Sequence, residues 1–298
     1  MFKTGFIGII GRPNVGKSTL LNAIIGERIA ITTSKPQTTR NRIMGIRNQA
    51  EGQMIFMDTP GIHQADSALN RHMVNTAKDT FGRVDILLLL VEAAAKVHPA
   101  DPFIIKSLPK GTIPVILVIN KIDLVKKMQL LPLIDQLHPL HPFAAVVPLS
   151  ARTGDGLSLL IDEILRALPE GPACFPADTM TDRPERFIAA EIVREKIIML
   201  THKEIPYATA VIVDTFKEDE QKRLIRIQAT IHVEKDSQKG ILIGKKGAKL
   251  KEIGTKARMD LEQFFNAKIY LELFVRVQKN WTHDEKMLKE FGYSHERG

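Results

Sequence analysis

The chain has 298 residues, of which 44% are hydrophobic and 26% charged, a composition typical of globular proteins with room for about two domains. The single Cys174 excludes an internal disulfide framework, and no cysteine and histidine residues have the spacing of a zinc site. The net charge of +8 favours an anionic partner. The longest apolar runs, 86–91 and 113–119, are far below the ~20 residues of a transmembrane helix. We therefore expect a cytoplasmic protein without a transmembrane segment or a signal peptide.

Residues 1–168 alternate short apolar runs with helix-like segments, the pattern of an α/β domain built on a doubly wound, mostly parallel sheet. A short turn at Glu51-Gly52 predicts that its two flanking strands form an antiparallel hairpin. Residues 154–168 have helical spacing and close the domain. The expected strands are 5–10, 43–47, 53–57, 86–91, 113–119 and 144–149.

Proline, glycine and small polar residues without apolar periodicity predict a linker at 169–183. After it, residues 184–280 predict a smaller α+β domain with the order α-β-β-α-α-β. Its expected elements are a helix over 184–201, strands over 207–216 and 224–233, a short helix, a turn at 244–247, a helix over 248–265 and a strand over 268–277. Residues 281–298 are expected to be a tail, whose Trp281, His283 and Tyr293 either pack on the domain, lie in a disordered segment or stack on RNA bases.

The segment from Gly11 to Ser18 reads G-x-x-x-x-G-K-S and lies between a predicted buried strand and the start of a helix. In this setting backbone N–H groups cradle phosphates, Lys17 reaches the β and γ oxygens, and Ser18 ligates Mg²⁺. The loop alone is also found in many ATPases, so it predicts a nucleotide site without naming the base.

Three further segments, each at the end of a predicted strand, answer separate needs of a guanine nucleotide. In 58–61, Asp58 can hold the Mg²⁺ shell and Gly61 leaves a backbone N–H free to approach the γ-phosphate. In 120–123, Asp123 can accept two hydrogen bonds that guanine donates and adenine lacks. Lys121 is expected along the base, and the backbone of 150–151 at the guanine oxygen. The predicted GTP or GDP site comprises Gly11, Asn14, Val15, Gly16, Lys17, Ser18, Thr19, Asp58, Gly61, Asn120, Lys121, Asp123, Ser150, Ala151 and Arg152.

With these motifs the chain resembles the translation-factor-like GTPases, and within them the Era family. The segment 34–41 looks like the first switch of that family. The resemblance implies that Thr38 or Thr39 closes over Mg²⁺ and the γ-phosphate, and the sequence does not choose between these adjacent residues. The expected magnesium ligands are therefore Ser18, Thr38, Thr39 and Asp58, and the expected catalytic group is Lys17, Thr38, Thr39 and Gly61.

The residue after Gly61 predicts slow intrinsic hydrolysis. Ras-like GTPases carry a water-orienting glutamine there, whereas this chain has the aliphatic Ile62. The water would then be positioned by the switch backbone or by a neighbouring group. His63 is one candidate for that group, and the alternative is that His63 is an exposed loop residue without a role in hydrolysis. Asn14 either holds an activating K⁺ ion, as in related GTPases, or only stabilises its loop.

The turn Gly244-Lys245-Lys246-Gly247 between two helices resembles that of a type II K-homology (KH) domain. Residues 239–258 contain seven basic residues and one acidic residue, and such a turn clamps the backbone of about four unpaired nucleotides. The apolar residues before the turn are expected to fix the first helix, and an apolar groove beside the turn is expected to receive the bases. Changing a groove residue such as Ile241 should also risk unfolding the domain. The predicted RNA-binding residues are Ile243, Gly244, Lys245, Lys246, Gly247, Lys249 and Lys251.

The resemblance to the Era family covers the chain from end to end and implies a monomeric GTPase that couples GTP to single-stranded rRNA in assembly of the 30S subunit. It also implies the 3′ end of 16S rRNA as partner and peripheral association with the inner face of the membrane. Two alternatives remain at this point: a nucleotide-gated RNA chaperone or scaffold with incidental hydrolysis, and a GTPase subunit of an RNA-modifying enzyme.

Overall fold

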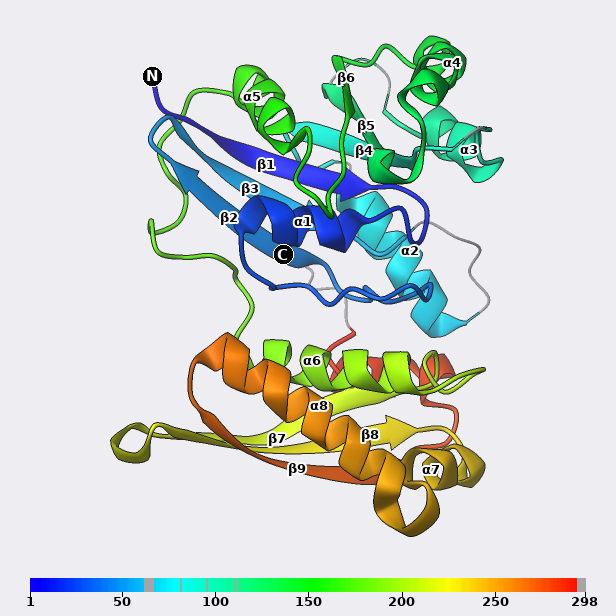
Figure 1. The fold of residues 1–298 in the computed structure, drawn as a ribbon, viewed down its shortest axis with the longest axis vertical. Helices are drawn as coiled ribbons and strands as arrows, with labels where there is room; N and C mark the ends of the chain where they lie inside the picture. The colour runs from blue at the N-terminus through cyan, green and yellow to red at the C-terminus, as the bar shows by residue number, and fades with distance from the viewer. Residues whose placement is uncertain (62–66, 81, 95, 110, 112, 294–298) are drawn as a thin grey trace. The chain divides into compact units, whose positions relative to one another are not determined.

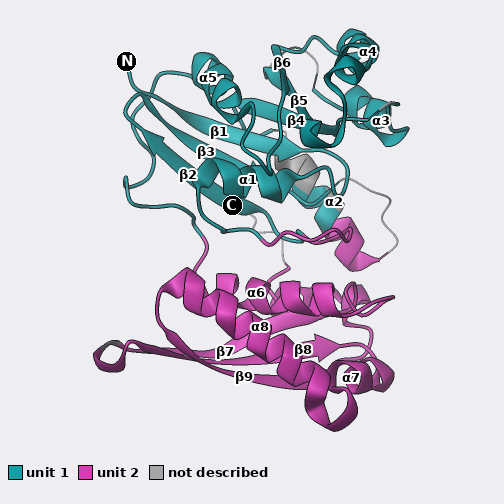
Figure 2. Ribbon diagram, viewed as in Figure 1, with its two compact units in different colours: residues 1–30, 39–65, 73–182 teal, residues 31–38, 66–72, 183–298 magenta. Residues whose placement is uncertain are grey.

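The computed structural model describes all residues except 62–66, 81, 95, 110, 112 and 294–298. The chain forms two compact units, shown in separate colours in Figure 2. Unit 1 comprises 1–30, 39–65 and 73–182, and unit 2 comprises 31–38, 66–72 and 183–298. Two short segments that precede residue 168 thus cluster with the C-terminal unit, which no pattern in the sequence predicts.

Unit 1 contains a six-stranded sheet in the order β2-β3-β1-β4-β5-β6 (Figure 1). All neighbours pair in parallel except β2 and β3, whose antiparallel register places Ile43 opposite Asp58 and Arg47 opposite Met54. The predicted hairpin and the mostly parallel sheet are therefore confirmed. The strands are β1 Lys3–Ile10, β2 Ile43–Gln49, β3 Gly52–Asp58, β4 Ile86–Glu92, β5 Val115–Asn120 and β6 Ala145–Pro148.

Both faces of this sheet are buried, which explains the continuous apolar runs in its strands. In β4, Leu87 and Leu89 belong to a core cluster with residues of α3 and α4, while the alternate Leu88 and Leu90 are also fully buried on the other face. The helices of the unit are α1 Lys17–Ile25, α2 Ala68–Thr80, α3 Ala100–Lys106, α4 Leu130–Leu137 and α5 Leu157–Ala167, the first residues of α2 belonging to unit 2.

The segment predicted as a linker packs along unit 1. Residue Lys3 forms an isolated antiparallel bridge with Glu170, and the backbone N–H of Ile46 donates to the carbonyl of Met180 at 2.8 Å. The fully buried Gln53 accepts from the backbone N–H of Cys174 and donates to the carbonyl of Phe175. Most of this segment is therefore fixed to the strands β1, β2 and β3.

Unit 2 has the predicted order of elements around a three-stranded sheet, β7-β8-β9, in which β7 and β8 are antiparallel and β8 and β9 parallel. The first strand begins three residues later than predicted because Tyr207 and Ala208 form a turn whose N–H groups donate to the carbonyl of Glu204. The elements are α6 Glu185–Leu200, β7 Ala210–Asp219, β8 Leu224–Val233, α7 Asp236–Ile243, α8 Ala248–Phe265, β9 Lys268–Val277 and α9 Glu285–Glu290.

The sheet of unit 2 is amphipathic. On β8, Ile227, Ala229 and Ile231 are fully buried in a core cluster with α6 and α8, which lie together on one side of the sheet in Figure 1. The opposite side carries exposed aromatic residues, Tyr270 and Phe274 of β9. Residues of one strand thus alternate between a covered face and a more open face.

The C-terminal tail packs on unit 2 as far as the structure describes it. Trp281 is fully buried and its indole N–H donates to the carbonyl of Ala208 at 3.1 Å. Its ring contacts those of Phe291 and Tyr293, with centroid distances of 5.3 and 5.9 Å. Of the three outcomes open for the tail, packing therefore applies to Trp281 and Tyr293, which leaves neither ring free to stack on RNA.

Candidate nucleotide and RNA sites

The loop between β1 and α1 has backbone conformations that require glycine. Gly11 has φ 150° and Gly16 has φ 100°. A Cβ atom on Gly11 would lie 2.5 Å from the carbonyl oxygen of Leu90, and one on Gly16 would lie 2.3 Å from Nδ2 of Asn120. The loop therefore packs too closely against β4 and β5 for any side chain at these positions.

Lys17 points back along its own loop. Its side chain is buried, and Nζ donates to the carbonyls of Gly11 and Arg12 at 3.2 and 3.1 Å. Burial lowers the pKa of Lys17 to about 8, while the nearby Asp58 opposes that change. Because the partners of the Lys17 ammonium are carbonyl oxygens of its own loop, the oxygens of a phosphate group can take their place.

Three oxygen-bearing side chains converge beside this loop. The Ser18 hydroxyl donates to Oδ2 of Asp58 at 2.6 Å and lies 2.8 Å from the hydroxyl of Thr39. Asp58 is fully buried, which raises its pKa to about 6, and its Oδ1 has no hydrogen-bond partner among the described residues. Buried oxygen ligands with a free carboxylate atom suit Mg²⁺.

The two candidate threonines lie in different surroundings. Thr39 belongs to unit 1, where it meets Ser18. Thr38 belongs to unit 2, where its hydroxyl donates to the carbonyl of Lys35. The same hydroxyl lies 2.7 Å from the hydroxyl of Thr33. The structure thus brings Thr39, and not Thr38, to the oxygen cluster.

Asn120 connects the loops expected around the nucleotide. Its Nδ2 donates to the carbonyl of Val15 at 2.8 Å, and its Oδ1 accepts from the backbone N–H groups of Lys121 and Ala151. Asn120 is 2% exposed, so these bonds are shielded from water. Asn120 therefore connects the loops that contain Val15, Lys121 and Ala151.

The neighbours of Asp123 favour the ionised form of its carboxylate, which only accepts hydrogen bonds. It accepts from the Ser150 hydroxyl at 2.6 Å and from the Arg152 guanidinium at 2.7 Å. The hydrogen bond from Ser150, with the charge of Arg152, keeps the pKa of Asp123 below its usual value. Such a carboxylate suits the two donors on the guanine edge.

An ion-pair network links the phosphate loop to the base loop, and the sequence motifs do not include it. Glu92, at the end of β4, accepts from Arg12 at 2.8 Å and lies 3.2 Å from the ammonium of Lys121. Asp101 lies 3.4 Å from Arg12 and is buried. The only signal in the sequence is the position of Glu92 at the carboxyl end of a parallel strand, where such sheets bind ligands.

The remaining predicted nucleotide residues lie on the same loops. Val15 is fully buried, Thr19 is half-buried, and Asn14 is exposed with φ 65°. Gly61 lies against the phosphate loop, because a Cβ there would be 2.8 Å from the backbone nitrogen of Pro13. Ile62 and His63 lie outside the described residues, so their expected roles in hydrolysis stay predictions.

In unit 2 the G-x-x-G turn joins α7 to α8 through backbone of positive φ at Gly244, Lys246 and Gly247. The lysines 245, 246 and 251 are exposed, whereas the ammonium of Lys249 pairs with Glu252 at 2.9 Å. The turn therefore presents exposed cations beside two partly exposed glycines.

The expectation that Ile241 is needed for the stability of the domain is wrong. Its side chain is 57% exposed, and the neighbouring Leu242 is fully buried in the core of unit 2. One step along a helix turns the side chain by about 100°, so only one of the two neighbours faces the core. Ile243, predicted to contact RNA, is half-buried at the end of α7.

Fold and site together define a P-loop GTP-binding protein that carries a KH domain. A family profile described as "50S ribosome-binding GTPase" matches residues 6–121, and a KH domain profile matches 204–282. The GTPase Era of Syntrophus aciditrophicus is 65% identical over 99% of this chain and 96% of its own length. That of Geobacter metallireducens is 57% identical over 98% of both chains. The chain belongs to the Era GTPase family, and it is a GTP hydrolase.

Two solved structures agree with this assignment. Both are 42% identical to this chain, with TM-scores of 0.94. One is a variant of Aquifex aeolicus Era bound to GDP and aluminium fluoride, and the alignment covers 98% of this chain and 99% of that one. The other is Era in complex with MgGDPNP and nucleotides 1506–1542 of 16S ribosomal RNA, with 99% and 100% covered.

Proposed function

We propose that this GTPase couples the binding and hydrolysis of GTP to the binding of single-stranded rRNA during assembly of the 30S ribosomal subunit. The target is the 3′ end of 16S rRNA. The observation that carries the proposal is the presence, in one chain, of a guanine-nucleotide site and an exposed lysine-bearing G-x-x-G turn. The related Era complex, which holds both a GTP analogue and a 16S rRNA segment, supports it.

In this proposal Lys17 binds the β and γ phosphates, Gly61 approaches the γ-phosphate through its backbone N–H, and Asp123 reads the guanine edge. Ser18, Thr39 and Asp58 hold Mg²⁺, which supplies positive charge against the phosphate oxygens when bound. The unpartnered Oδ1 of Asp58 supports this assignment. Of the two threonines, Thr39 is favoured by its 2.8 Å approach to Ser18.

Hydrolysis is proposed to be slow without a further activator, because Ile62 replaces the water-orienting glutamine. Asn14 is proposed to hold an activating K⁺ ion. Its exposed position and left-handed backbone in the phosphate loop leave its side chain outside the packed core.

The first switch is proposed to carry the nucleotide signal. Thr32 donates its backbone N–H to Glu195 of α6 at 3.0 Å, and the carbonyl of Thr38 accepts from Arg194 of the same helix. Closure of Thr39 over the nucleotide therefore acts directly on a segment that is anchored to α6. The proposal requires this segment to make different contacts in the two nucleotide states, as any switch does.

The proposal places the protein in the cytoplasm as a monomer, with peripheral contact at the inner face of the membrane. These points rest on membership of the family. Within the part of the chain that the structure describes, no helix has both the length and the apolar character needed to cross a bilayer.

GTP turnover measured with and without a short RNA matching the 3′ end of 16S rRNA tests the proposal. We expect this RNA to raise turnover and a scrambled RNA of equal length to leave it unchanged. Thr39→Ala should reduce turnover by weakening the Mg²⁺ site, whereas Thr38→Ala, as the matched control, should reduce it less. If the RNA binds but the rate of GTP turnover stays unchanged, a nucleotide-gated scaffold would be favoured instead.

A further inference from the structure

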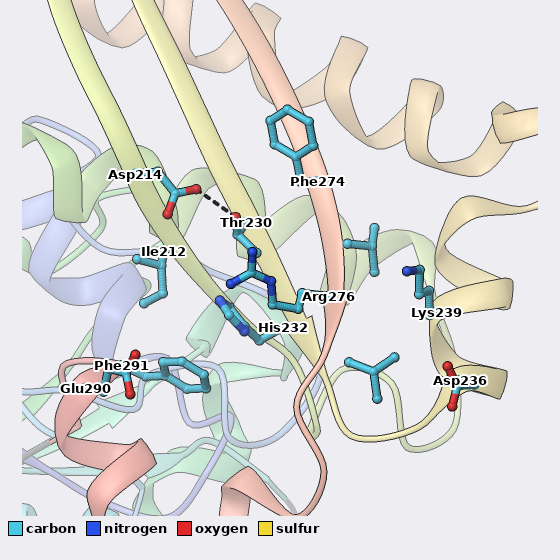
Figure 3. Close-up of a pocket in the computed structure, with 12 residues that line it drawn as sticks. Ile212, Asp214, Thr230, His232, Asp236, Lys239, Phe274, Arg276, Glu290 and Phe291 are labelled. Atoms are coloured by element: carbon cyan, nitrogen blue, oxygen red, sulfur yellow. Dashed lines mark hydrogen bonds between the residues drawn. The ribbon is translucent and has the colours of Figure 1, made fainter.

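The open face of the unit 2 sheet is hollowed beside its edge strand β9, and the hollow reaches round this strand to α7 and to Val275 and Val277, which pack on the covered face. A pocket of about 630 Å³ lies there, across strands β7, β8 and β9 and beside the segment after α9 (Figure 3). It is lined by Ile212, Asp214, Thr230, His232, Asp236, Lys239, Phe274, Val275, Arg276, Val277, Glu290 and Phe291. Neither the nucleotide site nor the G-x-x-G turn includes any of these residues.

His232 is a buried polar group with an unfilled bonding position. It is only 9% exposed, and its Nδ1 has no hydrogen-bond partner among the described residues. Burial and the neighbouring Arg276 lower the pKa of His232, which favours the neutral form of the imidazole. Its ring packs on Phe291 with a centroid distance of 4.4 Å. An unpartnered nitrogen in such a pocket is an open position for a ligand donor or acceptor.

Arg276 supplies a cation to the same pocket. Its guanidinium points across β8 toward Thr230 and Asp214 in Figure 3, and the hydroxyl of Thr230 donates to Asp214 at 2.7 Å. The side chain of Arg276 is exposed and makes no hydrogen bond or ion pair with the residues that the structure describes. The Arg276 guanidinium and the Asp214 carboxylate therefore face the pocket with donor and acceptor capacity to spare.

Exposed aromatic rings continue from the pocket along β9. Phe274 is 54% exposed and Tyr270 is 47% exposed, and both are on the same face of the strand. The guanidinium of Arg226 lies 5.5 Å from the centre of the Tyr270 ring. Rings displayed on an open sheet are a known platform on which unpaired bases stack.

The balance of charge narrows the class of ligand. Arg276 and Lys239 are matched at the pocket by Asp214, Asp236 and Glu290, so a bare polyanion gains little from this surface. A nucleobase instead offers a flat apolar ring for Phe274 or Phe291, and edge groups that donate to Asp214 and bond to His232. Its phosphate then pairs with Arg276.

We infer that this pocket binds one unpaired nucleotide of the RNA held at the Gly244–Gly247 turn, as a second RNA contact of unit 2. The inference rests on the RNA-binding function proposed above. Asp236 and Lys239 of the pocket are on the first turns of α7, whereas the G-x-x-G turn follows its last residue. The eight residues of this helix span about 12 Å, so the two contacts belong to different nucleotides.

The test is fluorescence anisotropy of the full chain with two labelled RNAs: one of about four nucleotides, which the turn alone can hold, and a longer single strand. Phe274→Ala and Arg276→Ala should each weaken binding of the longer RNA about tenfold and leave the short RNA unaffected. Phe274→Ala should leave the salt dependence unchanged, while Arg276→Ala should lower its slope by about one.

Phe103→Ala is the matched control, because Phe103 is 71% exposed on α3 in unit 1. His232→Phe keeps the ring packing and removes both nitrogens, and should weaken only the longer RNA. If the wild-type protein binds neither RNA, the proposed function itself is overturned. If the wild type binds both RNAs and the pocket variants bind the longer one equally well, with Trp281 fluorescence unchanged, the pocket is no RNA site, even if it captures another protein.

Discussion

The two glycines of the G-x-x-G turn differ in what a side chain would cost, and this difference is measurable. Gly244 has φ 71° and ψ 177°, a region occupied almost only by glycine. A Cβ atom there would lie 2.8 Å from Cβ and 3.0 Å from the backbone nitrogen of Lys249. Gly247 has φ 79° and ψ 6°, and a Cβ there would meet nothing within 4 Å.

From these geometries we expect Gly244→Ala to destabilise unit 2 by about 3 kcal/mol, since backbone strain and overpacking each cost roughly 1–3 kcal/mol. Gly247→Ala bears only the cost of the left-handed conformation, about 1 kcal/mol. The two variants should therefore differ by about 2 kcal/mol in the free energy of unfolding of this unit.

Trp281 makes the assay specific to unit 2, because it is the only tryptophan of the chain and is fully buried there. Its fluorescence in a urea titration should show midpoints about 1 M apart for the two alanine variants, given m-values of 1–3 kcal/mol/M. Equal midpoints, or a lower midpoint for Gly247→Ala, would refute this account of the turn.

The same comparison selects the better probe of RNA binding. Gly247→Asp should keep the fold, because aspartate tolerates left-handed backbone, yet it places a negative charge beside the phosphates. Gly247→Asn has nearly the same shape without the charge and serves as its control. We expect the aspartate variant to bind RNA clearly more weakly than the asparagine variant, with GTP affinity unchanged in both.

Three further outcomes are expected. Asp123→Asn should shift preference from guanine to xanthine nucleotides, because an amide donates where the carboxylate accepted; wild-type GTP affinity with rejection of XTP would contradict this base site. Replacing Na⁺ by K⁺ should raise kcat and Asn14→Ala should abolish the difference, whereas equal rates in both salts with RNA present would exclude the ion. Gln53→Ala should destabilise unit 1 by about 2 kcal/mol in guanidinium unfolding, because it strips the buried partners of the 174–175 backbone, while the exposed Gln136→Ala should change little.

The sequence alone was sufficient to locate the strands of both units to within a few residues and to identify the class of ligand. Sequence motifs such as 11–18 and 120–123 predict a GTP site because each chemical need is met within a few consecutive residues. The apolar runs predict the strands of unit 1 because both sheet faces are buried. The strands over 224–233 and 268–277 and the helix over 248–265 were predicted to the residue.

Only the tertiary structure decided which neighbours face which partner. Thr38 and Thr39 are adjacent and chemically identical, and long-range packing alone brings Thr39 to Ser18. Ile241 and Leu242 are both strongly apolar, but α7 packs on the core through the face that carries Leu242, so only Leu242 is buried. The link from Glu92 to Arg12 and the pocket around His232 join residues that are distant in sequence. Local patterns encode backbone conformation and chemistry, whereas pairing between distant side chains depends on register and packing, which no short stretch of sequence contains.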